Sequence, residues 1–233
     1  TEVGRKIAMD ASKSFKRVSL ELGGNNFSYV SSTADVELAA QKIAHSYLYN
    51  QGQCCISTRK VFVHESLYEE FLSHFVVLSK KLSSVHLVGR NLTDPNNTSM
   101  INSQLSELEE RSTIHNRISI NGNADINIFE VDDVDFDEEI FGPVILIQKV
   151  MDFQIVIGKV VKSNYGLAFS LFSRDEDEQE MAKLKLPVGR IWINEIMESP
   201  PELRIGGYGY SGNSWIGGKD ALSDYLTHKA IVT

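Results

Sequence analysis

The chain has 233 residues, enough for one large domain or two small ones around a sizeable core. Its 42% hydrophobic and 23% charged residues are ordinary for a globular protein, and its net charge of −8 argues against a nucleic-acid partner, which needs an excess of lysine and arginine. No apolar run approaches the roughly 20 residues that span a bilayer, so we expect no membrane association.

Helical and strand-like periodicities alternate along the chain, which predicts an α/β fold with a mostly parallel sheet flanked by helices. The stretch 118–131 suggests two strands around Asn121-Gly122, and the acidic run 132–139 is typical of a solvated loop. The tail is expected to hold a glycine-rich loop, a short helix and a final strand. In chain order, the predicted helices are 2–15, 35–52, 66–82, 101–112, 153–163 and 175–185, and the predicted strands are 18–22, 27–31, 59–64, 144–150, 167–173 and 189–195.

The two cysteines of the chain, Cys54 and Cys55, are adjacent and follow Gly52-Gln53 at a predicted helix end. Neighbouring cysteines cannot staple a fold, because a disulfide needs a suitable Cα separation, so we expect a reduced, cytoplasmic protein. Backbone N–H groups that converge on Cys55 at this turn would lower its thiol pKa and make it a nucleophile. The alternative is that both cysteines are small buried hydrophobic residues.

Two other segments carry candidate site residues. In "LELGGNN", Glu21 precedes Gly23-Gly24 and is either a general base with a raised pKa or a side chain that reaches solvent. The two glycines also have a simpler explanation as a chain turn. In "EEIFGPV", Glu139 is a candidate acceptor for the hydroxyl groups of a ligand, and Phe141 offers a ring face.

Together these segments resemble the NAD(P)-dependent aldehyde dehydrogenases. "LELGG" is similar to the family's glutamate signature, "NQGQCC" to its Gly-Gln-x-Cys signature and "EEIFGPV" to its cofactor-ribose motif. "SNYGLAFSLFSRD" and "GRIWIN" resemble two further family segments, and the resemblance fades only at about 84–135. It implies an aldehyde dehydrogenase-like catalytic domain that oxidises an aldehyde to a carboxylic acid with NAD or NADP, in a homo-oligomer, with no metal site.

The resemblance also implies catalytic roles. Gly-Gln-x-Cys makes Cys55, rather than Cys54, the nucleophile that attacks the aldehyde carbon, and its backbone N–H half of an oxyanion hole. Glu21 would activate the water that hydrolyses the thioester, and Asn194 would brace the cysteine loop.

Three residues are implied in binding NAD or NADP. Glu139 would hold the nicotinamide-ribose hydroxyls, Phe141 would pack near the nicotinamide ring, and Gly23 would line the same site.

Family members are about twice as long as this chain, and the half without a counterpart here is the N-terminal one. We therefore expect a part of a longer protein, with most of the cofactor-binding fold outside it. Residues 1–24 would end the cofactor-binding domain, 25–205 would form the catalytic domain, and 206–233 would pack against it or mediate oligomerisation.

Departures from the family pattern leave the substrate open. "RIGG" stands where the family usually has Pro-Phe-Gly-Gly, and Arg204 in it either favours an anionic aldehyde or forms a surface ion pair. Two other functions also stand as alternatives: a non-catalytic relative that acts as a structural or interaction module, and a cofactor-free thiol esterase that uses Cys55 and Glu21.

Overall fold

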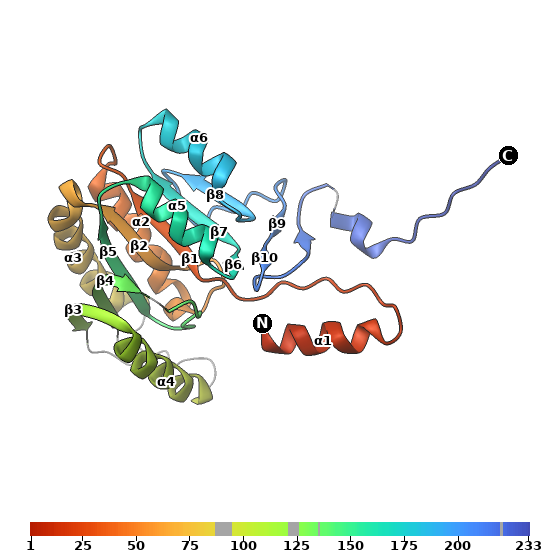
Figure 1. Cartoon of the computed structure of the whole chain (residues 1–233), viewed down its shortest axis with the longest axis horizontal. Helices are drawn as coiled ribbons and strands as arrows, with labels where there is room; N and C mark the ends of the chain where they lie inside the picture. Colours follow the sequence, from red (N-terminus) through yellow and green to blue (C-terminus); the bar gives the residue numbers. More distant parts are fainter. Residues whose placement is uncertain (87–94, 121–125, 135, 220) are drawn as a thin grey trace.

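The computed structural model describes residues 1–86, 95–120, 126–134, 136–219 and 221–233 (Figure 1). Seven strands form one sheet in the order β3-β4-β5-β2-β1-β7-β8. Its neighbouring strands are parallel except for the β3–β4 pair, which confirms the predicted α/β fold with a mostly parallel sheet. The strands are β1 (Asn26–Val30), β2 (Thr58–His64), β3 (Ser112–Ile120), β4 (Ile126–Val134), β5 (Val144–Val150), β7 (Ala168–Phe172) and β8 (Arg190–Ile193).

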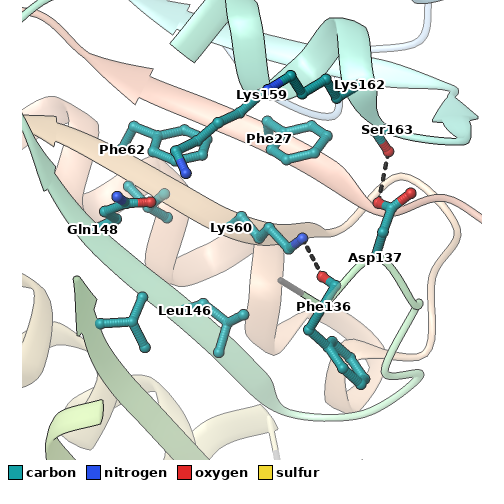
Figure 2. A pocket seen from close by; sticks show the side chains of 12 residues that line it. Phe27, Lys60, Phe62, Phe136, Asp137, Leu146, Gln148, Lys159, Lys162 and Ser163 are labelled. Carbon is teal, nitrogen blue, oxygen red and sulfur yellow. Dashed lines mark hydrogen bonds between the residues drawn. The ribbon is translucent and has the colours of Figure 1, made fainter. Parts of the chain in front are cut away.

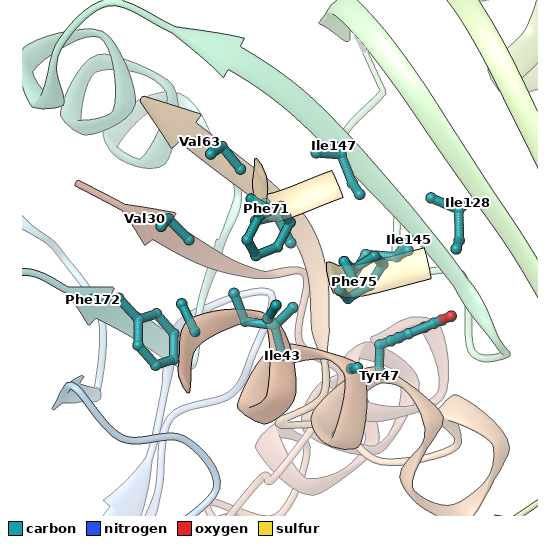
Figure 3. Packing of buried hydrophobic residues seen from close by; sticks show 14 of the residues in the cluster. Val30, Ile43, Tyr47, Val63, Phe71, Phe75, Ile128, Ile145, Ile147 and Phe172 are labelled. Atoms are coloured by element: carbon teal, nitrogen blue, oxygen red, sulfur yellow. The ribbon is translucent and has the colours of Figure 1, made fainter. Parts of the chain in front are cut away.

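Helices cover both faces of this sheet, because the central strands carry apolar side chains on both faces. On one face, α2 (Val36–Leu48) and α3 (Tyr68–His86) pack against the sheet through the hydrophobic cluster in Figure 3, which includes Phe71 and Phe75. The other face is covered by α4 (Pro95–Arg111), α5 (Phe153–Lys162) and α6 (Glu176–Lys185).

The remaining elements join the chain ends to this core. Helix α1 (Glu2–Ser12) buries only Gly4 and ends three residues before the predicted boundary. Two small antiparallel pairs, β6–β10 and β9–β11, hold the glycine-rich tail. Their bounds are β6 (Tyr165–Gly166), β9 (Ile205–Gly206), β10 (Tyr208–Gly209) and β11 (Trp215–Ile216); the short 3₁₀ helices are η1 (Tyr49–Gly52), η2 (Glu65–Leu67) and η3 (Ala221–Tyr225).

Two predicted strands are wrong. Residues 18–22 form a single isolated bridge, between Glu21 and Gly212. They cannot pair with β1 in the sheet, because β2 and β7 already flank that strand on both sides. The described residues after Tyr225 contain no strand, and Val232 is 96% exposed. A strand needs a neighbouring backbone for its hydrogen bonds, and Figure 1 shows this tail extending away from the rest of the chain.

The acidic run is a solvated loop only in part: residues 136–139 form no helix or strand and Glu138 is exposed, but other residues of the run differ from the prediction. Asp132 lies in β4, and Glu139 has a side chain only 14% exposed. Asp137 accepts hydrogen bonds from Asn25, Ser163 and Asn164. The two strands predicted around Asn121-Gly122 are present as β3 and β4, while the turn itself lies outside the described residues.

Candidate active site

The three sequence motifs meet at the amino edge of the sheet, which we define as the side where β1, β2 and β5 begin. Gly24 comes just before β1, Cys55 just before β2 and Glu139 just before β5. Parallel strands all begin at the same edge, so segments more than a hundred residues apart in sequence become neighbours there.

A tight turn presents the cysteines. After α2, the residues Asn50, Gln51 and Gly52 all have positive φ, at 50°, 60° and 71°. A Cβ atom on Gly52 would lie 2.1 Å from the carbonyl oxygen of Gly142, in the loop that follows Glu139. Glycine is required here both for its left-handed backbone and for this close approach.

The Cys55 peptide is held by Asn26 and Gly24. Asn26 Nδ2 donates to the carbonyl oxygens of Cys55 (2.6 Å) and Ser57 (2.9 Å), and its Oδ1 accepts from the N–H of Ala168 (3.0 Å). A Cβ on Gly24 would lie 2.2 Å from the Cys55 oxygen. Sequence reasoning missed Asn26; the available signal was an asparagine at the first position of a strand in which Phe27, Tyr29 and Val30 are hydrophobic.

Arg59 ties the cysteine turn to the Glu139 loop. Its side chain is 3% exposed and donates to the carbonyl oxygens of Gly52 (2.5 Å), Cys54 (3.2 Å) and Gly142 (3.1 Å). Arg59 Nη2 also lies 3.9 Å from Glu139 Oε1. Burial lowers the pKa of Arg59, and the Glu139 charge opposes that shift. Sequence reasoning missed this residue too, although a charged side chain in a central parallel strand is unusual.

The two thiols interact through a hydrogen bond between them. A hydrogen bond from the Cys55 thiol lowers the pKa of Cys54 to about 6, and Arg59 contributes to the shift. The same hydrogen bond, burial, and the charges of Cys54, Glu139 and Glu21 raise the pKa of Cys55. The pair therefore loses its first proton readily and its second with difficulty. The low first pKa is a property of the two thiols together and is not assigned to one cysteine.

Glu21 reaches this edge through contacts with the tail. Its Oε1 accepts a hydrogen bond from Ser214 Oγ (3.0 Å), and its backbone pairs with Gly212. Burial raises the pKa of Glu21, while the Ser214 hydrogen bond lowers it. A carboxylate with a raised pKa is suited to accept a proton from water.

The residues predicted to bind the cofactor lie together at this edge. Glu139 Oε2 lies 2.1 Å from where a Cβ on Gly23 would be, so these two residues are in contact. Burial raises the pKa of Glu139, against the Arg59 charge and a hydrogen bond from the Gly24 N–H. Glu139 Oε1 is buried and, among the described residues, has no hydrogen-bond partner. A buried acceptor without a donor fits a ribose hydroxyl. Arg59 lies near both this carboxylate and the predicted ring, because its Cζ is 5.8 Å from the centre of the Phe141 ring.

Asn194 does not brace the cysteine loop, so that prediction is wrong. Asn194 follows β8 at the carboxyl edge of the sheet, the side where β1, β7 and β8 end, and its amide bonds the main chain of Ser173 at 2.9 Å through both Oδ1 and Nδ2. The strand register aligns Asn194 with Val63 in β2. Val63 lies five residues, or about 16 Å, beyond Thr58, where β2 begins next to the cysteine turn.

The fold and these contacts define an α/β protein in which an adjacent cysteine pair and a buried glutamate lie at the same edge of a parallel sheet. The aldehyde dehydrogenase family model matches residues 1–111 and 129–231, so the chain belongs to the aldehyde dehydrogenase family. Aldehyde dehydrogenase 1A1 of Mus musculus is 32% identical over 249 residues, covering 99% of this chain and 49% of that protein. Retinaldehyde dehydrogenase 3 of Mus musculus is 31% identical, with 99% and 48% covered.

Solved structures agree with this family. Betaine aldehyde dehydrogenase of Staphylococcus aureus superposes with a TM-score of 0.87 at 25% identity, covering 98% of this chain and 49% of that one. An NAD-dependent aldehyde dehydrogenase from Sinorhizobium meliloti gives 0.84 at 25% identity, with 96% and 47% covered. This chain thus spans about half the length of its relatives. None of the helices in its described residues is long and apolar enough to cross a membrane.

Proposed function

We propose that this chain is the catalytic half of an enzyme that oxidises an aldehyde to a carboxylic acid with NAD or NADP. The observation that carries the proposal is that the Glu21 segment contacts both other motifs at the amino edge: Gly23 lies against Glu139 Oε2, and Gly24 against the Cys55 carbonyl oxygen. The Cys55 thiolate adds to the aldehyde carbon and gives a thiohemiacetal, whose oxidation leaves a thioester. Glu21 then takes a proton from the water that hydrolyses the thioester, which releases the acid and the thiol.

Glu139, Phe141 and Gly23 would hold the nicotinamide riboside end of the cofactor, which accepts the hydride when bound. Glu139 Oε1 offers the acceptor for a ribose hydroxyl. Which of the two dinucleotides binds would depend on the rest of the cofactor domain.

The domain boundaries follow from the same proposal. Residues 1–24 would complete the cofactor domain, 25–205 form the catalytic domain, and 206–233 pack beside it or contact a second subunit. The homo-oligomer and the cytoplasmic location stay predictions.

The test replaces each cysteine in turn in the full-length protein that contains this chain. Cys55→Ala should reduce aldehyde-dependent NAD(P)H formation by at least about 10³-fold, because a nucleophile has no substitute. Cys54→Ala is the matched control and should keep most of the activity. Normal turnover by Cys55→Ala, or loss confined to Cys54→Ala, would contradict the assignment.

Cofactor-free ester hydrolysis is a second candidate function. It is favoured by the presence of a thiol pair with one low pKa and of Glu21 with a raised pKa within this chain. The chain should then hydrolyse p-nitrophenyl acetate without any dinucleotide, and Cys55→Ala should abolish the reaction. Hydrolysis that survives this change would exclude the esterase.

A further inference from the structure

Asp137 ties the segment that carries Glu139 to two other parts of the chain. Its Oδ1 accepts hydrogen bonds from Asn25 Nδ2 (3.1 Å) and Ser163 Oγ (2.7 Å), and its Oδ2 accepts from the N–H (2.7 Å) and the Nδ2 (3.1 Å) of Asn164. Figure 2 shows the bond from Ser163. A carboxylate has about four acceptor sites, so this one is fully used in holding its neighbours.

The partners of Asp137 belong to segments that meet around Glu139. Asn25 is two residues after Gly23, and the other two partners come immediately before Tyr165. A Cβ on Gly23 would lie 2.1 Å from Glu139 Oε2 and 3.7 Å from Tyr165 Cε1, so both side chains lie against this glycine. Asp137 therefore joins the three segments that come together at the Glu139 carboxylate.

Other side chains hold the Glu139 segment from elsewhere in the fold. The segment forms no helix or strand between Phe136 and Glu139. Lys60 in β2 donates to the carbonyl oxygen of Phe136 (Figure 2), and Gln104 in α4 donates to that of Glu139 (3.1 Å). These bonds tie the segment to the sheet and to α4, while the Asp137 bonds tie it to the loops before β1 and after α5. Side-chain bonds, rather than regular secondary structure, thus fix the place of Glu139.

Asp137 and Glu139 also line the same cavity at the amino edge. Its volume is about 430 Å³, and Asn164 and Tyr165 are among its other walls. A side chain that binds a ligand must be held within roughly 0.5 Å of its working position, and bonds from neighbouring side chains usually do this. Asp137 is placed to do so for Glu139.

We propose that Asp137 is a positioning residue for dinucleotide binding, which acts by holding Glu139 where its Oε1 meets a ribose hydroxyl. The inference rests on the function proposed above and deepens it. Because protein donors already occupy both Asp137 oxygens, the residue contributes geometry and makes no bond of its own to the cofactor.

The test is a fluorescence titration with NADH and with NADPH, in the full-length protein that contains this chain. Asp137→Ala should weaken binding of the preferred dinucleotide about tenfold, while kcat for aldehyde oxidation at saturating dinucleotide changes less than about twofold. Asp175→Ala is the matched control. Asp175 accepts two backbone hydrogen bonds at the start of α6 and does not line this cavity, so its loss should lower stability and leave dinucleotide affinity unchanged.

Ser163→Ala is a milder second variant, which keeps the inference testable if Asp137→Ala does not fold. It removes one of the four hydrogen bonds to Asp137 and should weaken dinucleotide binding about threefold. In the Asp137→Ala background the same change should have no further effect, because the bond is already lost.

Wild-type dinucleotide affinity in a folded Asp137→Ala protein would overturn the inference, and so would wild-type affinity in Ser163→Ala. Equal losses of affinity in Asp137→Ala and Asp175→Ala would also overturn it, since affinity would then follow stability alone. A wild-type protein that binds neither dinucleotide would contradict the proposed function itself, so the two failures are distinguishable.

Discussion

The two edges of the sheet hold polar clusters of opposite character. At the carboxyl edge, Asn194 bonds the main chain of Ser173 twice, Ser173 Oγ donates to Glu178 (2.5 Å), and Thr33 Oγ1 lies 3.2 Å from Ser173 Oγ. Each of these side chains has a partner. Such a closed network fixes the strand ends and leaves little capacity to bind anything else.

The amino edge is tightly packed but incompletely paired. Arg59 Nε, Glu139 Oε1 and Asn25 Oδ1 are buried there and, within the part of the chain that is described, have no hydrogen-bond partner. A buried group without a partner costs free energy, and folds keep such groups mainly at functional sites. The open acceptor of Glu139 at the amino edge fits the active site proposed there, whereas the hydrogen bonds at the carboxyl edge hold the strand ends together.

The largest expected effect is that of Arg59→Met. It leaves three carbonyl oxygens and Glu139 without their cation, so the free energy of unfolding in urea should fall by about 3 kcal/mol. Loss of the Arg59 charge also raises the pKa of the Cys54 thiol, so iodoacetamide alkylation should begin at higher pH.

Lys42→Met is the control at the carboxyl edge. It removes a partly exposed partner of Glu195 and should cost less than about 1 kcal/mol. Equal losses of unfolding free energy in Arg59→Met and Lys42→Met would contradict the proposed difference between the two edges of the sheet.

Gly24→Ala tests how closely the amino edge is packed. The new methyl group would press on the Cys55 carbonyl oxygen, so we expect a loss of stability of about 1–3 kcal/mol and a lower rate of ester hydrolysis. Gly158→Ala in α5 is the matched control. Nothing lies within 4 Å of its added Cβ, and alanine favours a helix, so stability should rise by about 0.5–1 kcal/mol. A Gly24→Ala enzyme with full activity would show that the cysteine turn tolerates displacement.

Asn194→Ala should affect stability without affecting chemistry. It removes two hydrogen bonds to Ser173, at a cost of about 1–2 kcal/mol in urea unfolding, while kcat for ester hydrolysis stays unchanged. A large fall in kcat with unchanged stability would restore a role for Asn194 at the cysteine loop.

The smallest effect is expected from Ser214→Ala. Glu21 acts as a base only when it is ionised, so the rate of ester hydrolysis should rise with pH through its pKa. Without the Ser214 hydrogen bond this pKa rises further above its ordinary value of 4.5, and the acid limb of the pH–rate profile should move to higher pH. Ser106→Ala on α4 is the control, and its profile should match that of the wild type. A limb that moves to lower pH would contradict the assignment of Glu21.

Local signals explain why most elements were predictable. Asp35, Asp152 and Asp175 each cap the helix that follows them, and the apolar runs at 144–150 and 167–173 became central strands. The strand predicted at 18–22 failed for the opposite reason. Its residues have the composition of a strand, but the place beside β1 was already occupied, and only the backbone of Gly212 remained to pair with.

The sequence by itself determined the order of the elements, the family and the identity of Cys55, Glu21 and Glu139 as candidates, because these depend on local periodicity and on short motifs. Tertiary structure decided which candidates meet. Strand direction and register place Cys55 and Asn194 at opposite edges, and packing buries Asn26 and Arg59 beneath the cysteines. Such long-range contacts arise from the packing of the whole sheet, which no short stretch of sequence encodes.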